Sequence, residues 1–301
     1  MGILKCHIDL ILDFKSRTPS SFMGNTLTFG QQAIYMEMQS FQKKLMRNGI
    51  SLRTFPKHFD YACKIPSWLG TPQERYINAN TFFYLLGSDK TISLDYSKYE
   101  NSELIFDLNK KIPKRYENNF DTIIDIGTSE HIFNIPQVLE NVFIALRNNG
   151  HYIFSLPVSN AIDHGFFSFS PGFFYDYFSI NNFKILDSYL IERSPYFYES
   201  SFNIFKYKPG PEMPMTSSKF IETFFIVKKI EKSSFDKIPY QNIYQNNLWK
   251  KDKKSQQIIN KNLSMQFLKN LIKKLFLNKF TPHFIHNFLF KFIRGKNIRK
   301  L

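Results

Sequence analysis

The hydrophobic positions of the first 230 residues follow two patterns. Some segments repeat apolar residues every three or four positions, which indicates helices with one buried face. Others are mostly apolar runs bounded by Gly, Pro or Asn, which indicate buried strands. The predicted helices cover residues 3–15, 31–48, 72–86, 129–148 and 171–182, and the predicted strands cover 24–30, 91–97, 103–109, 120–127, 151–157, 183–192 and 219–230.

The order of these elements predicts the fold class. Helices between successive strands imply right-handed crossovers and parallel neighbours. The strands at 183–192 and 219–230 have no helix between them, so we expect them to pair antiparallel at one edge. The sequence therefore predicts an α/β, Rossmann-like fold with a mainly parallel sheet, an antiparallel edge strand and a helical basic C-terminal tail.

The chain divides into one α/β domain and that tail. Residues 1–246 form the predicted domain, with a loop insertion at about 48–71, and residues 247–301 form the tail. The tail holds 12 Lys and 2 Arg against Asp252, so it carries 13 of the 15 net positive charges. The domain is nearly neutral, which makes nucleic acid an unlikely partner.

The tail combines this charge with apolar stripes. Leu263, Phe267, Leu271 and Leu275 recur every four residues, and more phenylalanines follow Pro282. Two basic amphipathic helices of this kind suit an anionic membrane surface, where each Lys contributes about 1 kcal/mol. Docking on the domain itself or on a protein partner is the alternative, and nucleic acid is the least favoured.

Composition fits a globular chain in a reducing compartment. Hydrophobic residues make up 43% of the chain, enough for a core without disulfides. Cys6 and Cys63 form neither a disulfide framework nor a C-x-x-C motif, so we expect no metal site. Asp9 and Asp13 interrupt the apolar N-terminal stretch, which argues against a signal peptide. We expect a cytoplasmic protein, peripheral at the inner face of the membrane if the tail binds lipid.

Two successive predicted strands end in an acidic residue, Asp95 in the first and Asp107 in the second. Residues 122–131, TIIDIGTSEH, then form a strand and a glycine turn. A first strand of a dinucleotide-binding fold would be followed by a strand ending in an acid about 20 positions later. The next strand ends instead at Pro157. TIIDIG therefore lies across the topological switch from a first strand at 24–30, and ligands bind beyond the strand ends at such a switch.

The run from Ile92 to Pro157 resembles the second half of a class I S-adenosylmethionine-dependent methyltransferase, of the kind called type 11. Members commonly show a Phe-Asp strand, a Glu-His pair opening the next helix, a glycine turn and an apolar strand that reaches a proline. In FDTIIDIGTSEHIFNIPQVLENVFIALRNNGHYIFSLP the matching residues are Glu130, His131, Gly150 and Pro157.

The resemblance implies S-adenosylmethionine as the cofactor and assigns residues to its adenosyl part. Asp95 would accept hydrogen bonds from both ribose hydroxyls, since two carboxylate oxygens suit a vicinal diol. Tyr96 would cover the adenine face. Asp107 would accept from the adenine amino group, and the Leu108 backbone amide would meet a ring nitrogen.

The resemblance also implies residues around the methionine part. Asp125 and Gly127 would lie beside it, the glycine allowing close approach of the backbone. The first loop of the family carries an acid and two or three glycines, whereas TLTFGQQ offers only Gly30 and no acid. Gln31 and the amides of the following helix would then take part in binding.

Two histidines are candidates for the chemistry. His131 follows Glu130, and its ordinary interpretation is a packed helix residue. His164 lies in the loop after the strand ending at Pro157, on the crevice side, where loops supply acceptor contacts. Its ordinary interpretation is an exposed loop residue. The segment DHGFFSFSP around it is similar to a subgroup of the family with a His-Gly-aromatic stretch there.

Together these observations predict methyl transfer from S-adenosylmethionine to a small-molecule or glycan-like acceptor at a hydroxyl, with His164 or His131 as the base. No Asn-Pro-Pro-aromatic motif follows TIID, which disfavours methylation of nucleic-acid bases. The depleted first loop and the basic tail also fit a catalytically silent methyltransferase-like fold that is recruited to membranes as an interaction protein. A nicotinamide-dependent enzyme using the same crevice is the third hypothesis.

Overall fold

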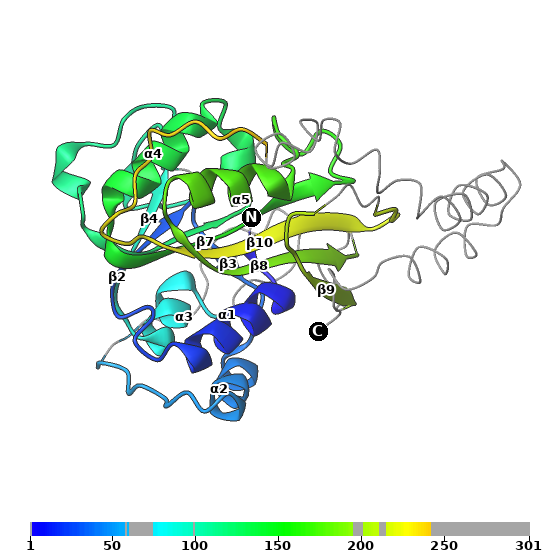
Figure 1. Ribbon diagram of the computed structural model, residues 1–301. Coiled ribbons are helices and arrows are strands. Elements are labelled where there is room, and N and C mark those ends of the chain that lie inside the picture. Colours follow the sequence, from blue (N-terminus) through cyan, green and yellow to red (C-terminus); the bar gives the residue numbers. More distant parts are fainter. Residues whose placement is uncertain are drawn as a thin grey trace, which may run out of the picture.

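The computed structural model describes residues 2–57, 59, 75–98, 100–194, 201–210 and 215–241 (Figure 1). The predicted basic tail at 247–301 lies outside the described residues, and so does most of the predicted loop insertion.

One eight-stranded sheet forms the centre of the structure, in the order β5-β4-β2-β6-β7-β10-β8-β9. The pairs from β5 to β7 are parallel, whereas β10 is antiparallel to β7 and β8, and β9 is antiparallel to β8. This confirms the predicted fold class. The strands are β2 (Gly24–Phe29), β4 (Ser88–Asp95), β5 (Leu104–Ile105), β6 (Phe120–Ile126), β7 (Leu146–Ser159), β8 (Lys184–Arg193), β9 (Phe202–Lys206) and β10 (Phe220–Lys228).

The antiparallel region is larger than the sequence predicts. β8 and β10 pair as expected, but β10 inserts between β7 and β8 and does not lie at the edge. The strand at this edge is β9, which forms between the two predicted strands 183–192 and 219–230, in a segment for which no strand was predicted. β9 is only five residues long, so its alternation is too short to stand out.

Helices cover both faces of the sheet (Figure 1): α1, α2 and α3 lie on one face and α4 and α5 on the other. Within the described ranges, none of the helices combines the length and apolar character needed to span a bilayer. A separate two-stranded sheet pairs β1 with β3. The bounds are β1 (Gly2–Ile3), α1 (Lys5–Arg17), β3 (Ala33–Ile34), α2 (Met38–Arg47), α3 (Ala79–Leu86), α4 (Ile135–Ala145) and α5 (Pro171–Ile180).

Alternation along the central strands divides the core between these two layers. Successive side chains of a strand point to opposite faces. Ile124 and Phe224 therefore belong to the cluster under α1 and α3, whereas Ile123 and Phe225 belong to the cluster under α4 and α5. A strand that is buried on both faces has a nearly continuous run of apolar residues. The runs TIIDI and ETFFIV could therefore be recognised as strands from the sequence.

Three helices begin later than predicted, and α3, expected from residue 72, starts at Ala79. The run from residue 31 first forms β3, and α2 starts only at Met38. The run from residue 129 first forms a short 3₁₀ turn, Ser129–His131, and α4 starts at Ile135. Pro136 sits in the first turn of α4, where its missing N–H and fixed φ favour a helix start. The side chain of Asn134 caps this turn by accepting from the Gln137 amide.

Candidate functional site

The topological switch of the sheet lies at β2, which pairs with β4 on one side and with β6 on the other. The chain passes from β2 to β4 and β5 in one direction, then from β6 to β7 in the other. A crevice beyond the carboxyl ends of the strands at such a switch is the usual ligand site of an open α/β sheet. Gly30, Asp95 and Gly127 stand at these three strand ends.

Gly30 and Asp95 are brought together there. Gly30 has a φ of +69°, a left-handed conformation that favours glycine, and its amide donates to the Leu94 carbonyl at 2.7 Å. A Cβ built on Gly30 would lie 3.9 Å from Asp95 Oδ2 and 3.2 Å from Thr128 Oγ1. The first loop therefore packs directly against the acid that ends β4.

Asp95 is the last residue of β4 and is partly exposed. Its Oδ1 accepts from the Ser97 amide at 3.2 Å, and its carbonyl accepts from the Phe106 amide at 2.8 Å. The side chain of the next residue, Tyr96, is 75% exposed. The acid is therefore held beside an aromatic ring that is open to a ligand.

Asp107 follows β5, next to the loop of Asp95. Its Oδ1 accepts from the backbone amide and the side-chain amide of Asn109, both at 3.0 Å. These hydrogen bonds lower the pKa of Asp107, as does the charge of Lys110 at 3.6 Å from Oδ2. Asp107 is thus an ionised hydrogen-bond acceptor at neutral pH.

The loop after Asp107 is fastened by Asn141 of α4. The side-chain amide of this buried residue donates to the carbonyls of Leu108 at 3.1 Å and Lys110 at 2.9 Å. Its oxygen accepts from the Ile112 amide at 2.8 Å. The backbone around Leu108 is therefore held in one conformation by a side chain that the sequence did not single out.

Asp125 shapes the turn after β6 from beneath. The carboxylate is fully buried and accepts from Tyr152 OH at 2.7 Å, from the hydroxyl of Ser129, and from the amides of Thr128 and Ser129 at 3.3 and 3.2 Å. Burial raises the pKa of Asp125 despite these donors. The side chain thus points at the turn and β7, and it contributes to the site through the position of Gly127.

Thr128 connects the two halves of the switch. Its hydroxyl donates to the Phe29 carbonyl at 2.7 Å, so the turn after β6 is tied to the end of β2. Gly127, with a φ of +83°, directly precedes it and donates its amide to the Ser155 carbonyl at 3.1 Å. The backbone of this turn is held on both sides.

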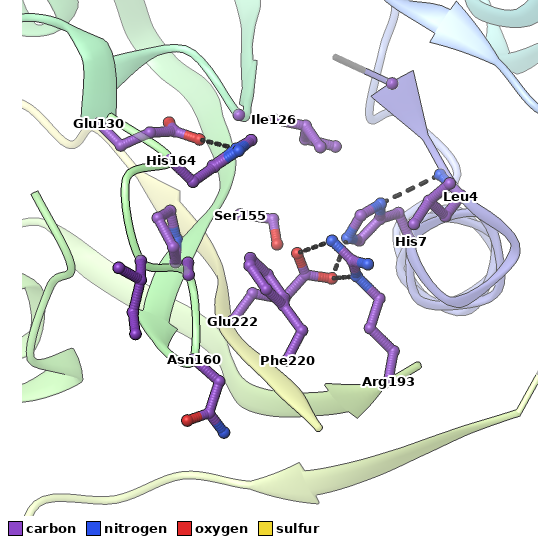
Figure 2. Close-up of a pocket in the computed structure, with 15 residues that line it drawn as sticks. Leu4, His7, Ile126, Glu130, Ser155, Asn160, His164, Arg193, Phe220 and Glu222 are labelled. Atoms are coloured by element: carbon purple, nitrogen blue, oxygen red, sulfur yellow. Dashed lines mark hydrogen bonds and ion pairs between the residues drawn. The ribbon is translucent and has the colours of Figure 1, made fainter. Parts of the chain in front are cut away.

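A pocket of about 260 Å³ opens next to this turn, between the carboxyl ends of β6 and β7 and the N-terminal end of β10. Gly127 contributes to its lining, whereas Gly30 and Asp95 lie outside it. Two polar groups face each other across the pocket in Figure 2, one around Glu130 and one around Glu222. The pocket therefore lies on the Gly127 side of the crevice, away from the residues Gly30 and Asp95 that are predicted to bind the adenosyl group.

The first polar group contains both predicted histidines. Glu130, only 1% exposed, places Oε1 3.6 Å from His164 Nε2 and 3.9 Å from His131 Nε2. The two imidazole rings are 5.3 Å apart between centroids. Burial raises the pKa of Glu130 to about 6, and burial together with the charge of His164 lowers the pKa of His131.

The second polar group was not predicted. His7 Nδ1 accepts from the Leu4 amide at 3.1 Å, so its Nε2 carries the proton and donates to Glu222 Oε1 at 2.8 Å. Arg193 Nε donates to the same oxygen at 3.1 Å. Burial alone would raise the pKa of Glu222, but the hydrogen bonds from His7 and Arg193 and the charge of Arg193 lower it. The available signal was the lone acid in the apolar run KFIETFFIVKKI.

Ser155 of β7 was also missed. Its hydroxyl is buried, lines the pocket, and has no hydrogen-bond partner among the described residues. In Figure 2 it lies between the two polar groups. Because a buried hydroxyl is normally satisfied, Ser155 is a candidate contact for a bound molecule.

Comparisons with known proteins give only distant matches. No protein-family model and no curated protein matches the sequence. Among solved structures, the chain is similar to Burkholderia thailandensis 1,6-didemethyltoxoflavin-N1-methyltransferase, with 11% identity, coverage of 74% of this chain and 78% of that one, and a TM-score of 0.38. The chain is also similar to the N-methyltransferase NodS of Bradyrhizobium japonicum, with 10% identity, coverage of 74% of this chain and 97% of that one, and a TM-score of 0.36.

A methyltransferase from Mesorhizobium loti is matched over only 40% of its own length, with 25% of this chain covered, 19% identity and a TM-score of 0.22. The assignment of the fold rests on the sheet itself. Its strand order, switch point and antiparallel strands confirm the predicted Rossmann-like α/β fold.

Proposed function

We propose that the protein is an S-adenosylmethionine-dependent methyltransferase that acts on a hydroxyl of a small-molecule or glycan-like acceptor. The observation that carries this proposal is the contact of Gly30 with Asp95 at the switch point, with Gly127 in the neighbouring turn. These residues are remote in sequence, and an α/β sheet binds ligands where they meet.

The adenosyl group fits the residues around Asp95. The ribose diol would donate to the carboxylate of Asp95, and Tyr96 is exposed for stacking on adenine. The ionised Asp107, two residues after the adjacent strand β5, would accept from the adenine amino group. Gly30 would let the backbone approach the cofactor closely because no Cβ separates it from Asp95.

The pocket beside Gly127 suits the acceptor. Its volume of about 260 Å³ fits part of a small molecule or a sugar ring, and its polar walls offer hydrogen bonds to hydroxyl groups. In the transfer, a bond forms between the acceptor oxygen and the methyl carbon. The bond from that carbon to sulfur breaks, and its electron pair stays on the sulfur. The protein mainly aligns the three atoms and excludes water.

The proton of the acceptor hydroxyl must also leave. His164 lines the pocket, with its Nε2 3.6 Å from Glu130 Oε1, and its imidazole is the candidate acceptor of this proton. Replacing His164 by Ala should lower the turnover number by roughly 10²-fold or more while the dissociation constant of the cofactor stays unchanged. An unchanged turnover number would remove His164 from the reaction.

Calorimetry with S-adenosylmethionine tests the binding step. The Asp95→Ala variant should bind at least about 10-fold more weakly, since a hydrogen bond to a charged group contributes roughly 1.5–3 kcal/mol. Asp89→Asn is the matched control, because Asp89 lies at the opposite end of the same strand and is 70% exposed. If the wild-type protein shows no binding at millimolar ligand, the alternative of a silent fold that serves as a membrane-recruited interaction protein is favoured.

A further inference from the structure

We propose that Glu130, His131 and His164 form a binding site for a divalent transition-metal ion in the wall of the acceptor pocket. One carboxylate oxygen and one imidazole nitrogen come from the consecutive residues Glu130 and His131, and a second imidazole nitrogen comes from His164 in the loop after β7. These three atoms all lie within 4.8 Å of one another. A search of the sequence for C-x-x-C motifs does not find this site, because none of its three ligands is a cysteine.

The distances between the ligand atoms suit a shared ion after a small adjustment. Metal bonds to imidazole nitrogen and carboxylate oxygen are about 2.0–2.2 Å long, so two ligands of one ion stand roughly 3.0–3.6 Å apart. In the structure, Glu130 Oε1 is 3.6 Å from His164 Nε2 and 3.9 Å from His131 Nε2. The side chains of His131 and His164 are 38% and 46% exposed, so their rings have room to turn inward.

Glu130 supplies an independent indication of a ligand. Its side chain is 1% exposed, and Oε2 is a buried oxygen with no hydrogen-bond partner among the described residues. A buried carboxylate oxygen without a donor is unfavourable, and native proteins rarely retain one unless a water or an ion satisfies it. A bound cation would compensate this carboxylate directly.

The backbone segments that carry the three ligands are fixed to each other. The Glu130 carbonyl accepts from the amides of Phe166 at 2.8 Å and Phe167 at 3.2 Å, which follow His164 in the loop after β7. A Cβ on Gly165 would lie 2.8 Å from that carbonyl, and its φ of +113° also requires glycine. The His131 amide donates to the Thr128 carbonyl at 3.0 Å. The site is therefore positioned before an ion arrives.

The donor set indicates the class of metal. Two imidazoles and one carboxylate suit Zn²⁺, Fe²⁺, Mn²⁺ or Co²⁺ better than Mg²⁺ or Ca²⁺, which prefer oxygen ligands. Three protein ligands leave coordination positions open for water or a substrate. Because Glu130 and His164 line the pocket, an acceptor oxygen bound there would reach the ion.

A second group of potential ligands, Cys6, His7 and Glu222, does not compete well for an ion. Its members are all buried, Glu222 is paired with Arg193, and His7 Nδ1 already accepts from the Leu4 amide. An ion there would displace an existing ion pair, whereas at Glu130 it would neutralise a buried carboxylate whose other oxygen, Oε2, has no hydrogen-bond partner in the described parts of the chain.

The use of the ion rests on the proposed methyl transfer, although its binding does not. A metal-bound hydroxyl of the acceptor loses its proton at a lower pH, and the proton would pass to solvent water. The resulting oxygen anion attacks the methyl carbon while sulfur retains the electron pair of the broken bond. With the ion in place, His164 acts as a ligand, and the ion takes over the activation that the free imidazole would give as a base.

Titration of the chelator-treated full-length protein with Co²⁺, followed by visible absorption, tests the site without any methyl donor. We expect one Co²⁺ per chain, competed by Zn²⁺, and at least 10-fold weaker binding in His131→Ala and in His164→Ala. The control His151→Gln, which changes a histidine of β7 outside the group, should bind as the wild type does. Both test substitutions remove half-exposed rings, and thermal melting checks that the variants fold.

Absence of saturable Co²⁺ binding, or equal binding by the wild type and both variants, would overturn the proposal. Loss of binding in His7→Gln with retention in His164→Ala would overturn it as well, because the ion would then lie at the buried group. If the protein binds Co²⁺ but not S-adenosylmethionine, the metal site is supported and the proposed methyl transfer is contradicted. Binding of the cofactor with no binding of Co²⁺ would overturn the metal site and leave methyl transfer standing.

Discussion

Gly30 and Asp95 meet at the end of two paired strands, where a Cβ on Gly30 would stand 3.9 Å from Asp95 Oδ2. The parallel register that sets Phe29 opposite Leu94 produces this contact, although a helix and a loop insertion separate the two strands in sequence. A glycine without a side chain beside a partly exposed acid leaves space for a ligand at the switch point. The proposed cofactor site depends on this relationship.

Gly30→Ala should weaken cofactor binding by at least about 10-fold, since the new methyl group would press on Thr128 Oγ1 at 3.2 Å and approach Asp95. The backbone strain at a φ of +69° should also lower the free energy of unfolding by roughly 1–2 kcal/mol. Calorimetry and urea unfolding measure the two effects.

Gly49→Ala is the matched control for this substitution. Gly49 has the same φ of +69°, but no atom lies within 4 Å of its built Cβ. The two variants should lose similar unfolding free energy, and only Gly30→Ala should lose affinity for S-adenosylmethionine. Equal affinities would show that Gly30 does not contact the cofactor.

Asn141→Ala should release the loop that carries Leu108, because three hydrogen bonds from the loop to this buried side chain are lost. We expect a loss of about 2–3 kcal/mol in unfolding free energy and several-fold weaker cofactor binding. Asn181→Ala is the comparison: Asn181 is equally buried and bonds the segment around Lys237 instead. It should destabilise similarly without changing affinity, and a parallel loss of affinity would argue against a role for the 108 loop.

Glu222→Gln should lower the free energy of unfolding by about 3 kcal/mol, since Arg193 would keep a buried charge without its carboxylate partner. Glu192→Gln, on the neighbouring strand β8, changes a partly exposed acid whose Oε2 accepts from Asn203, and it should cost less than about 1 kcal/mol. Urea unfolding of both variants measures this difference. Similar losses would mean that the Glu222 group contributes nothing beyond an ordinary surface pair.

The free energy of unfolding should depend on pH through the titration of His151. Burial, and secondarily the charge of Lys228, lowers the pKa of His151 from 6.5 to about 4. The unfolded chain therefore binds a proton between pH 6.5 and 4 that the folded protein does not bind, so stability falls as pH falls through this window. The loss should approach roughly 3 kcal/mol near pH 4.

The His151→Gln variant lacks this titration. Its unfolding free energy should fall less than that of the wild type between pH 7 and 4, and the difference between the two profiles isolates His151 from other groups such as Glu130. Profiles that run parallel over this range would contradict the assignment of a buried neutral imidazole.

The sequence predicts the central strands well because each is buried on both faces and reads as an apolar run, as in β6. It also places Asp95 and Gly30 at strand ends, since a glycine or acid after such a run marks the turn. Helix starts are predicted less well, because local pairing of β3 and the position of Pro136 decide where α2 and α4 begin.

Residues whose partners are far away in the sequence could not be predicted from sequence patterns. Glu222 and His7 are 215 positions apart, and only the antiparallel insertion of β10 brings them together in the wall of the pocket. The pairing of Glu130 with His164 similarly depends on how the loop after β7 folds back on the turn after β6. Conversely, Asp125 fits the family pattern by position, but its burial against Tyr152 is a tertiary feature.

A crystal structure of the protein grown with S-adenosylhomocysteine tests the central claim most directly. We expect the ribose hydroxyls within hydrogen-bonding distance of the Asp95 carboxylate, with the ligand passing over Gly30 toward Gly127. A ligand bound elsewhere, or crystals in which millimolar S-adenosylhomocysteine leaves the space between Gly30 and Asp95 empty, would contradict it.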